Sequence, residues 1–252
     1  MIKLSVVIIT FNEEQNIARC LDSVKDLADD IVVVDSFSTD NTVNLCKSYG
    51  AKVFSLPFEG YVNQKNKADQ YAASDYILSL DADEVLSETL IQSIKQVKNN
   101  WEKEGYYLSR LNNYCGKWIR HCGWYPDRKL RLFDRRKGEW KGITLHEKFE
   151  VEGETGILKG DLLHYTYPTI ASHITQTQKF TSIAARELFQ QEKKATPFKI
   201  LFSPVFKFLK SYFVKLGFLD GYQGLMVCSI SAWSNYLKYK KLASLRKEKA
   251  HV

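Results

Sequence analysis

The sequence lacks the signatures of several large protein classes. It has five cysteines among 252 residues, with no C-x-x-C pair and no zinc-ligand spacing, so neither a disulfide framework nor a structural zinc site is expected. It contains no N-x-[ST] sequon, no internal repeat and no low-complexity tract, and its first apolar run, residues 4–10, is not preceded by a signal peptide. These absences favour a reducing compartment, and we expect the protein to be cytoplasmic.

Nucleotide-binding loops and membrane spans are missing as well. There is no G-x-G-x-x-G and no G-x-x-x-x-G-K-[ST], so dinucleotide-binding and P-loop functions lose their main support. Residues 198–216 carry four lysines, and the apolar residues 222–238 are interrupted by Gln, Ser and Asn, so both are poor transmembrane candidates. Hydrophobic residues make up 44% of the chain and charged residues 26%, which is typical of a folded globular protein.

Strand-like and helix-like segments alternate through the first hundred residues. Apolar, β-branched runs predict buried strands at 4–10, 31–34, 52–56 and 76–80. Helical segments are expected between and after them, at about 14–25, 42–49, 62–73 and 88–99. This order predicts an α/β fold with a doubly wound parallel sheet. Beyond Gly105 a mixed, partly antiparallel extension is expected, with strands at 106–108, 129–133, 146–151 and 162–167 and a helix at 170–194.

Polar side chains follow three of the predicted strands at the point where each strand ends. The first strand is followed by Thr10-Phe11-Asn12-Glu13, the second by Asp35, and the fourth by Asp81-Ala82-Asp83-Glu84. In a doubly wound sheet, ligands bind beyond these carboxyl ends. Neighbouring carboxylates there can bind Mg²⁺ or Mn²⁺, which keeps positions open for substrate phosphates. Asp-x-Asp alone is also common in surface turns, but three such strand ends on one rim favour a binding site.

Three motifs together resemble the family-2 glycosyltransferases of the GT-A fold: the runs 5–14, 33–42 and 80–84. Four later runs are similar to bacterial lipopolysaccharide core β-1,4-glucosyltransferases: 123–127, 131–133, 145–147 and 163–167. The resemblance implies a GT-A, Rossmann-like nucleotide-sugar-binding fold with a mixed sheet and C-terminal amphipathic helices. It also implies an inverting transfer of a hexose, glucose from UDP-glucose, onto a heptose of the lipid A–core oligosaccharide.

The resemblance assigns roles to individual residues. Thr10, Phe11 and Asp35 are expected to hold the uracil and ribose, and Asp81 to face the ribose. Asp83 is expected to bind the divalent metal, Mg²⁺ or Mn²⁺, that bridges the diphosphate and stabilises the charge of the leaving group. The expected nucleotide-sugar-binding set is completed by Asn12, Glu13, Lys65, Ala82 and Arg131.

An inverting transfer also needs a base that takes the proton of the acceptor hydroxyl during in-line attack. Glu147 is the main candidate, Asp127 is in reserve, and Glu84 ranks behind them. The alternative for Glu147 is a surface acid beside Lys148.

Two further residues have open roles. His164 follows an apolar pair and is a candidate second metal ligand, because several GT-A enzymes recruit a late histidine, or else a hydrogen-bonded structural residue. Arg131, together with Arg128, is a candidate phosphate clamp, or else part of a solvated basic face with Lys129 and its neighbours.

The last fifth of the chain holds all of the excess positive charge. Residues 196–252 contain ten Lys and Arg against two Asp and Glu, a net charge of +8, whereas residues 1–195 contain 26 against 27. Residues 198–216 alternate lysines with large apolar groups, as in a basic amphipathic helix at an anionic bilayer surface. Such a tail would bring the enzyme to a lipid-anchored acceptor. Packing on the catalytic domain or on a second subunit is the alternative.

We therefore expect a GT-A catalytic domain at 1–195 and a basic aromatic helical tail at 196–252. Within the domain, 1–100 is the nucleotide-sugar-binding half and 101–195 the acceptor-side half. The expected partners are a UDP-sugar donor, a lipid-linked oligosaccharide acceptor and an anionic membrane surface, with no nucleic acid, and a homodimer is left open. The expected location is the cytoplasmic side of a bacterial inner membrane. Transfer of another sugar to a different glycan or lipid carrier, a nucleotidyltransferase and a non-catalytic glycolipid-binding module are the rivals.

Overall fold

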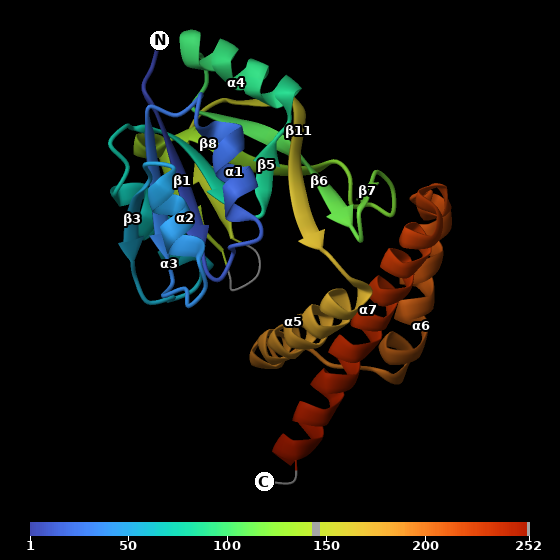
Figure 1. The fold of residues 1–252 in the computed structure, drawn as a ribbon. Helices are drawn as coiled ribbons and strands as arrows, with labels where there is room; N and C mark the ends of the chain where they lie inside the picture. Colours follow the sequence, from blue (N-terminus) through green and yellow to red (C-terminus); the bar gives the residue numbers. More distant parts are fainter. Residues whose placement is uncertain (143–146, 251–252) are drawn as a thin grey trace. The chain divides into compact units, whose positions relative to one another are not determined.

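The computed structural model describes residues 1–142 and 147–250 and separates into two compact units (Figure 1). Unit 1 comprises Met1–Leu111 and Pro126–Tyr165, and unit 2 comprises Asn112–Tyr125 and Thr166–Val252. The chain passes between the units three times: within strand β6 (Gly105–Tyr114), between Tyr125 and Pro126, and within strand β11 (Thr155–Tyr167).

The first half of unit 1 is the predicted parallel α/β arrangement. Its parallel strands stand in the order β3-β2-β1-β4: β1 (Leu4–Thr10), β2 (Asp30–Asp35), β3 (Lys52–Ser55) and β4 (Tyr76–Asp81). The helices between and after them are α1 (Ile17–Val24), α2 (Thr42–Ser48), α3 (Tyr61–Gln70) and α4 (Glu88–Asn99). Residues at i, i+3, i+4 and i+7 of α1 are buried, and Ser87 caps α4 by accepting from the Leu90 N–H.

The second half of unit 1 extends the sheet with antiparallel strands. Strand β8 (Asp127–Asp134) pairs with β4, and the order continues through β6 and β11 to β5 (Glu84–Leu86). A separate two-stranded sheet pairs β9 (Gly138–Lys141) with β10 (Lys148–Val151). The strand predicted at 146–151 is observed from Lys148; Leu145 and His146 lie outside the described residues. The predicted α/β class with a mixed sheet is confirmed.

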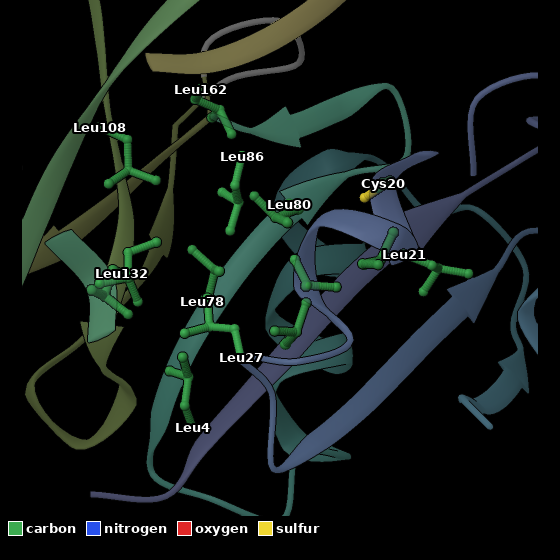
Figure 2. Close-up of a cluster of buried hydrophobic side chains, with 14 of the residues drawn as sticks. Leu4, Cys20, Leu21, Leu27, Leu78, Leu80, Leu86, Leu108, Leu132 and Leu162 are labelled. Atoms are coloured by element: carbon green, nitrogen blue, oxygen red, sulfur yellow. The ribbon is translucent and has the colours of Figure 1, made fainter. Parts of the chain in front are cut away.

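A leucine-rich core holds unit 1 together. Figure 2 shows Leu78 and Leu80 of β4 among side chains from α1, β1, β5, β8 and β11. Each of the two leucines has no solvent-accessible area. Fully burying a leucine contributes roughly 1.5–3 kcal/mol relative to leaving it exposed. The core therefore fixes β4, the strand whose end carries Asp81 and Asp83.

Unit 2 is largely helical. Strand β7 (Lys117–Ile119) pairs with the end of β6, and three long helices follow: α5 (Ile170–Gln190), α6 (Pro197–Leu209) and α7 (Gly221–Ala250). Helix α7 packs on both of the others. Lys241 Nζ lies 2.9 Å from Thr181 Oγ1 of α5, and Asn235 Nδ2 donates to Ser203 Oγ of α6 at 2.9 Å.

The observed division of the chain differs from the expected one. The sequence placed the boundary at 195, whereas α5 groups with α6 and α7 in unit 2. The physical reason is the contact of α5 with α7, which a boundary drawn from charge composition does not register. Pro204 lies inside α6, which begins with Pro197 after its N-cap Thr196. In the described part of the chain, no helix combines the length and apolarity needed to cross a membrane.

Candidate functional site

The ends of β1 and β2 form one side of a polar rim in unit 1. Thr10 and Asp35 are register partners in the parallel pair, so their side chains leave the sheet at the same level. The Asp35 carboxylate is 1% exposed and accepts hydrogen bonds from the Ser38 N–H at 2.9 Å and from the Ser38 hydroxyl. Thr10 Oγ1 is buried and has no hydrogen-bond partner among the described residues. A buried hydroxyl without a protein partner has hydrogen-bonding capacity left for water or for a ligand.

Two loops interlock at this rim. Asn12 donates its N–H to Ser38 Oγ and accepts from the Thr39 N–H through Oδ1, each at 2.8 Å. Asn12 and Phe37 both have positive φ, +53° and +63°, a backbone state that non-glycine residues adopt rarely and that clusters at binding sites. The turns leave the rings of Phe11 and Phe37 exposed, 56% and 58%, where they can stack on a flat ligand.

The Asp81 carboxylate is held by two buried cations. Oδ1 lies 2.7 Å from Lys65 Nζ, and Oδ2 lies 2.6 Å from Arg131 Nη2. The Lys65 and Arg131 side chains are 1% and 3% exposed, so Arg131 is not part of a solvated basic face. Burial works to raise the pKa of Asp81, but Arg131 and Lys65 outweigh it and hold that pKa well below its usual range. Asp81 is therefore ionised at any pH of interest.

A second buried acid, Glu84, extends this network. Its side chain is fully buried, Oε1 accepts from Arg131 Nη2 at 3.0 Å, and Oε2 accepts from the Asp81 N–H at 3.0 Å. Arg110 reaches the same Oε1 at 3.4 Å and pairs with Asp127 Oδ2 at 2.6 Å. Burial works to raise the pKa of Asp127, but Arg110 and Lys129 hold it below its usual range. Asp127 and Glu84 are thus paired acids, and a paired carboxylate is a weak base.

Asp83 faces His164 across the neighbouring strands. The Nε2 atom of His164 lies 3.1 Å from Asp83 Oδ2, and the Tyr165 N–H donates to the Asp83 carbonyl at 3.0 Å. Glu13 lies close enough that its pKa, raised mainly by burial, is raised further by Asp83 and lowered by His164. Residues that follow β1 and β4, together with His164 within β11, thus contribute to one polar cluster.

The spacing of Asp83 and His164 is compatible with two ligands of one divalent metal ion. A metal bound at right angles by a carboxylate oxygen and an imidazole nitrogen, with bonds of about 2.1 Å, holds those two atoms about 3 Å apart. The 3.1 Å separation of Asp83 and His164 agrees with that geometry. In residues 1–142 and 147–250, no three His, Cys, Asp or Glu side chains gather as a metal site. The described residues would therefore supply a partial ligand set.

Glu147 lies on the same side of unit 1 as the acid network. It is partly buried, and its charge raises the pKa values of both Arg131 and Tyr61. Asp81 and Asp83 also raise the pKa of Tyr61, after burial, so Tyr61 marks a place near all three carboxylates. The description of Glu147 as a surface acid beside Lys148 therefore does not account for its surroundings.

Trp140 connects the network to a buried acid on α3. Its ring lies 4.7 Å from Lys65 Nζ and 5.8 Å from the Arg131 guanidinium carbon, and its indole N–H donates to Asp69 Oδ2 at 2.9 Å. Asn66 holds the Trp140 backbone through two hydrogen bonds of 2.9 Å. Burial raises the pKa of Asp69 to about 7, although the Trp140 hydrogen bond opposes it. Lys65 and Asp69 are one helical turn apart, which places both against Trp140.

Sequence patterns had not indicated several of these residues. Arg110 pairs with Asp127 because the two are register partners of antiparallel β6 and β8, a pairing that the sequence does not encode locally. Gln64 is 1% exposed and donates to Ser36 Oγ at 3.2 Å, and its Oε1 has no partner among the described residues. One sequence signal did point to α3 as part of the site. Lys65 and Asp69 stand at i and i+4 of a mostly polar helix, and this spacing places both on one face.

Comparison with known proteins gives a family match and full-length relatives. The family model described as "Glycosyl transferase family 2" matches residues 5–156. An uncharacterized glycosyltransferase of Rickettsia typhi is 30% identical over 264 residues, covering 100% of this chain and 90% of the relative. The lipopolysaccharide core biosynthesis glycosyltransferase LpsC of Rhizobium meliloti is 28% identical over 256 residues, covering 94% and 93%. The structure of S. aureus TarS residues 1–349 with UDP is 14% identical, covers 98% of this chain and 92% of that one, and has a TM-score of 0.49.

Proposed function

Because the chain belongs to glycosyltransferase family 2, we propose that it transfers a hexose, glucose from UDP-glucose, onto a heptose of a lipid A–core oligosaccharide. The sugar-transfer class follows from the family. The lipopolysaccharide acceptor is supported by the 28% identical relative from Rhizobium meliloti, whose description names core biosynthesis and which this chain matches over 94% of its length. The donor sugar and the heptose come from the motif resemblance.

The observation that carries the proposal is the arrangement of Asp81 and Asp83 at the end of β4. Asp81 is held by Lys65 and Arg131, which fixes the strand end, and Asp83 lies 3.1 Å from His164. In our proposal Asp83 and His164 hold a divalent metal, Mg²⁺ or Mn²⁺, which as a Lewis acid would stabilise the departing diphosphate. The remaining coordination positions are left to water and to the donor phosphates.

The donor nucleoside is proposed to lie against the rim formed by β1 and β2. Thr10 and Asp35 offer a hydroxyl and a carboxylate to the base and ribose, and Phe11 offers an exposed ring. The interlocked turns around Asn12 hold these groups in place before the donor arrives, so that little ordering entropy is lost on binding. Gln64 joins this set through its orphaned, buried Oε1.

Glu147 is the proposed base. During in-line displacement its carboxylate takes the proton of the acceptor hydroxyl while that oxygen bonds to the anomeric carbon and the bond to the diphosphate breaks, which inverts the anomeric configuration. Asp127 and Glu84 are less suited, because Arg110 or Arg131 already neutralises each of them. Arg131 also lies close enough to Glu147 for the two charges to interact.

The direct test is a transfer assay with purified protein. Deacylated lipopolysaccharide core that ends in heptose is incubated with Mn²⁺ and UDP-glucose, UDP-galactose or UDP-N-acetylglucosamine, and the products are read by mass spectrometry. A gain of one hexose from UDP-glucose alone supports the proposal. Transfer only from another donor would show that the assigned sugar is wrong, while the assignment as a glycosyltransferase would stand. No transfer to the core, together with transfer to an undecaprenyl-linked sugar, would remove the lipopolysaccharide acceptor.

A further inference from the structure

Helix α6 and the segment after it carry a dense set of exposed apolar side chains. Each of them is at least 37% exposed. On α6 they are Phe198, Leu201, Phe202, Val205, Phe206 and Leu209. After α6 they are Phe213, Val214, Leu216, Phe218, Leu219, Tyr222 and Leu225. Soluble proteins rarely leave so many large apolar groups together in water, and such a patch marks an interaction surface.

On α6 these side chains form one stripe. Their spacing is i, i+3, i+4, i+7, i+8 and i+11, which at about 100° per residue gathers them on one side of the helix. The rest of the helix surface packs within unit 2: Ser203 accepts from Asn235 of α7, and Phe208, which borders the stripe beside Leu201, joins an apolar cluster with Tyr114 and Val227. The helix thus packs within unit 2 through its less apolar side, and its most apolar side is exposed among the described residues.

The charges around this stripe have one sign. Six lysines between residues 193 and 225 are exposed: Lys193, Lys194, Lys199, Lys207, Lys210 and Lys215. The one acid in that interval, Asp220, is 4% exposed and accepts hydrogen bonds from the N–H groups of Arg120 and His121. By the helical angles, Lys199 and Lys210 lie at the edge of the apolar stripe. An apolar centre with a cationic border complements an anionic lipid surface.

We propose that the lipid-docking surface lies in the interface of a bilayer containing anionic phospholipids. This surface is defined as the exposed apolar and lysine residues of 193–225 other than Lys207, which the helical angles place opposite the stripe. The phenylalanines and leucines would enter the boundary between headgroups and acyl chains, and the lysines would contact the headgroup phosphates. A second copy of the chain is a poorer occupant, because a two-fold contact through this surface would bring two sets of lysines together. The proposal rests on unit 2 alone and does not depend on the sugar-nucleotide site.

The test is flotation of the full-length protein with vesicles, without any sugar nucleotide. Vesicles of phosphatidylcholine with 30% phosphatidylglycerol, roughly an anionic bilayer composition, are compared with pure phosphatidylcholine at low and physiological salt. We expect binding to the anionic vesicles that weakens with salt. The double variant Lys199→Ala/Lys210→Ala should lose about five-fold in affinity for each lysine removed. Phe202→Ser/Phe206→Ser should lose about ten-fold or more, because apolar area leaves the interface.

A matched control separates this surface from general stickiness. Ile157 lies in unit 1 and is 55% exposed, so Ile157→Ser removes an exposed apolar group of similar exposure from elsewhere and should leave vesicle affinity unchanged. Circular dichroism is used to check that each variant is folded. If the phenylalanine variant does not fold, the lysine variant still tests the proposal.

Two results would overturn the proposal: no flotation of the wild type with anionic vesicles, or a phenylalanine-dependent dimer in sedimentation that persists when vesicles are added. Neither result concerns sugar transfer to a soluble acceptor. A failure of the membrane proposal can therefore be distinguished from a failure of the proposed glycosyltransferase activity.

Discussion

The ammonium of Lys65 lies 2.7 Å from Oδ1 of Asp81, and the lysine side chain is only 1% exposed. The pair joins α3 to the end of β4, the strand that carries both acids of the Asp-x-Asp motif. Water has little access to the ammonium of Lys65, so this lysine depends on Asp81 rather than on solvent for its charge partner. The proposed donor site therefore depends on α3 as well as on the strand ends.

Replacing Lys65 should lower the stability of the fold more than replacing a lysine whose ion pair is exposed. Lys65→Met leaves Asp81 with Arg131 as its remaining strong partner, and breaking a buried pair typically costs about 3–5 kcal/mol. Lys67→Met is the matched control: Lys67 is on the same helix, pairs with Glu59 at 2.6 Å, and is 39% exposed. Its loss should cost less than about 1 kcal/mol. Urea unfolding measures both, and equal costs would show that the Lys65–Asp81 contact does not stabilise the fold.

Metal binding should depend on Asp83 and His164 together. Asp83→Asn and His164→Ala should each weaken Mn²⁺ binding in the presence of UDP by more than about ten-fold. Mutating residues that only hydrogen-bond to a metal ligand already weakens metal binding by about 10–100-fold. Calorimetry reads the affinity directly. Asp22→Asn, which removes an exposed carboxylate paired with Lys25, should leave it unchanged. Normal Mn²⁺ affinity in His164→Ala would make His164 a structural residue that only positions Asp83.

The two candidate bases can be told apart by paired amide substitutions. Glu147→Gln should keep UDP-sugar binding and lower turnover by about 10²–10⁴-fold, the usual contribution of a general base. Asp127→Asn removes the 2.6 Å partner of Arg110 and should lower stability more than turnover. Single-turnover assays and thermal unfolding measure the two effects. If Asp127→Asn were folded but inactive and Glu147→Gln were active, Asp127 would be the base and Glu147 would not.

The sequence anticipated the parts of the fold that depend on short-range pattern. The β-branched runs of β1 and β2 and the acids after β4 are readable because neighbouring residues determine them. It also named Asp81, Asp83 and Arg131 as site residues; the structure brings Asp81 and Arg131 within 2.6 Å, and their roles in binding stay predictions. What it missed depends on pairing between distant segments: Arg110 meets Asp127 through the β6–β8 register, and Trp140 meets Asp69 because β9 packs on α3. The boundary at 195 differed for the same reason, since α5 joins α7 through contacts some sixty residues apart in sequence.

The buried Asp69 carboxyl should make stability depend on pH in a defined window. Burial raises its folded-state pKa to about 7, above the value of about 3.9 for an unfolded aspartate. The folded state therefore binds this proton more tightly, so the contribution of Asp69 to stability is fully present below pH 4 and is lost as the pH rises towards 7. Between these limits the free energy of unfolding should fall by up to about 1.4 kcal/mol per pH unit relative to Asp69→Asn, whose amide does not titrate.

Trp140 gives this pH effect an internal check. Its indole N–H donates to Asp69 Oδ2 and favours the ionised carboxylate, so Trp140→Phe should raise the Asp69 pKa further and extend the loss of stability above pH 7. Denaturant unfolding at pH 4 to 8 of the wild type, Asp69→Asn, Trp140→Phe and the double variant measures the effect. If the wild type and Asp69→Asn gave parallel pH profiles, Asp69 would titrate alike in the folded and unfolded states.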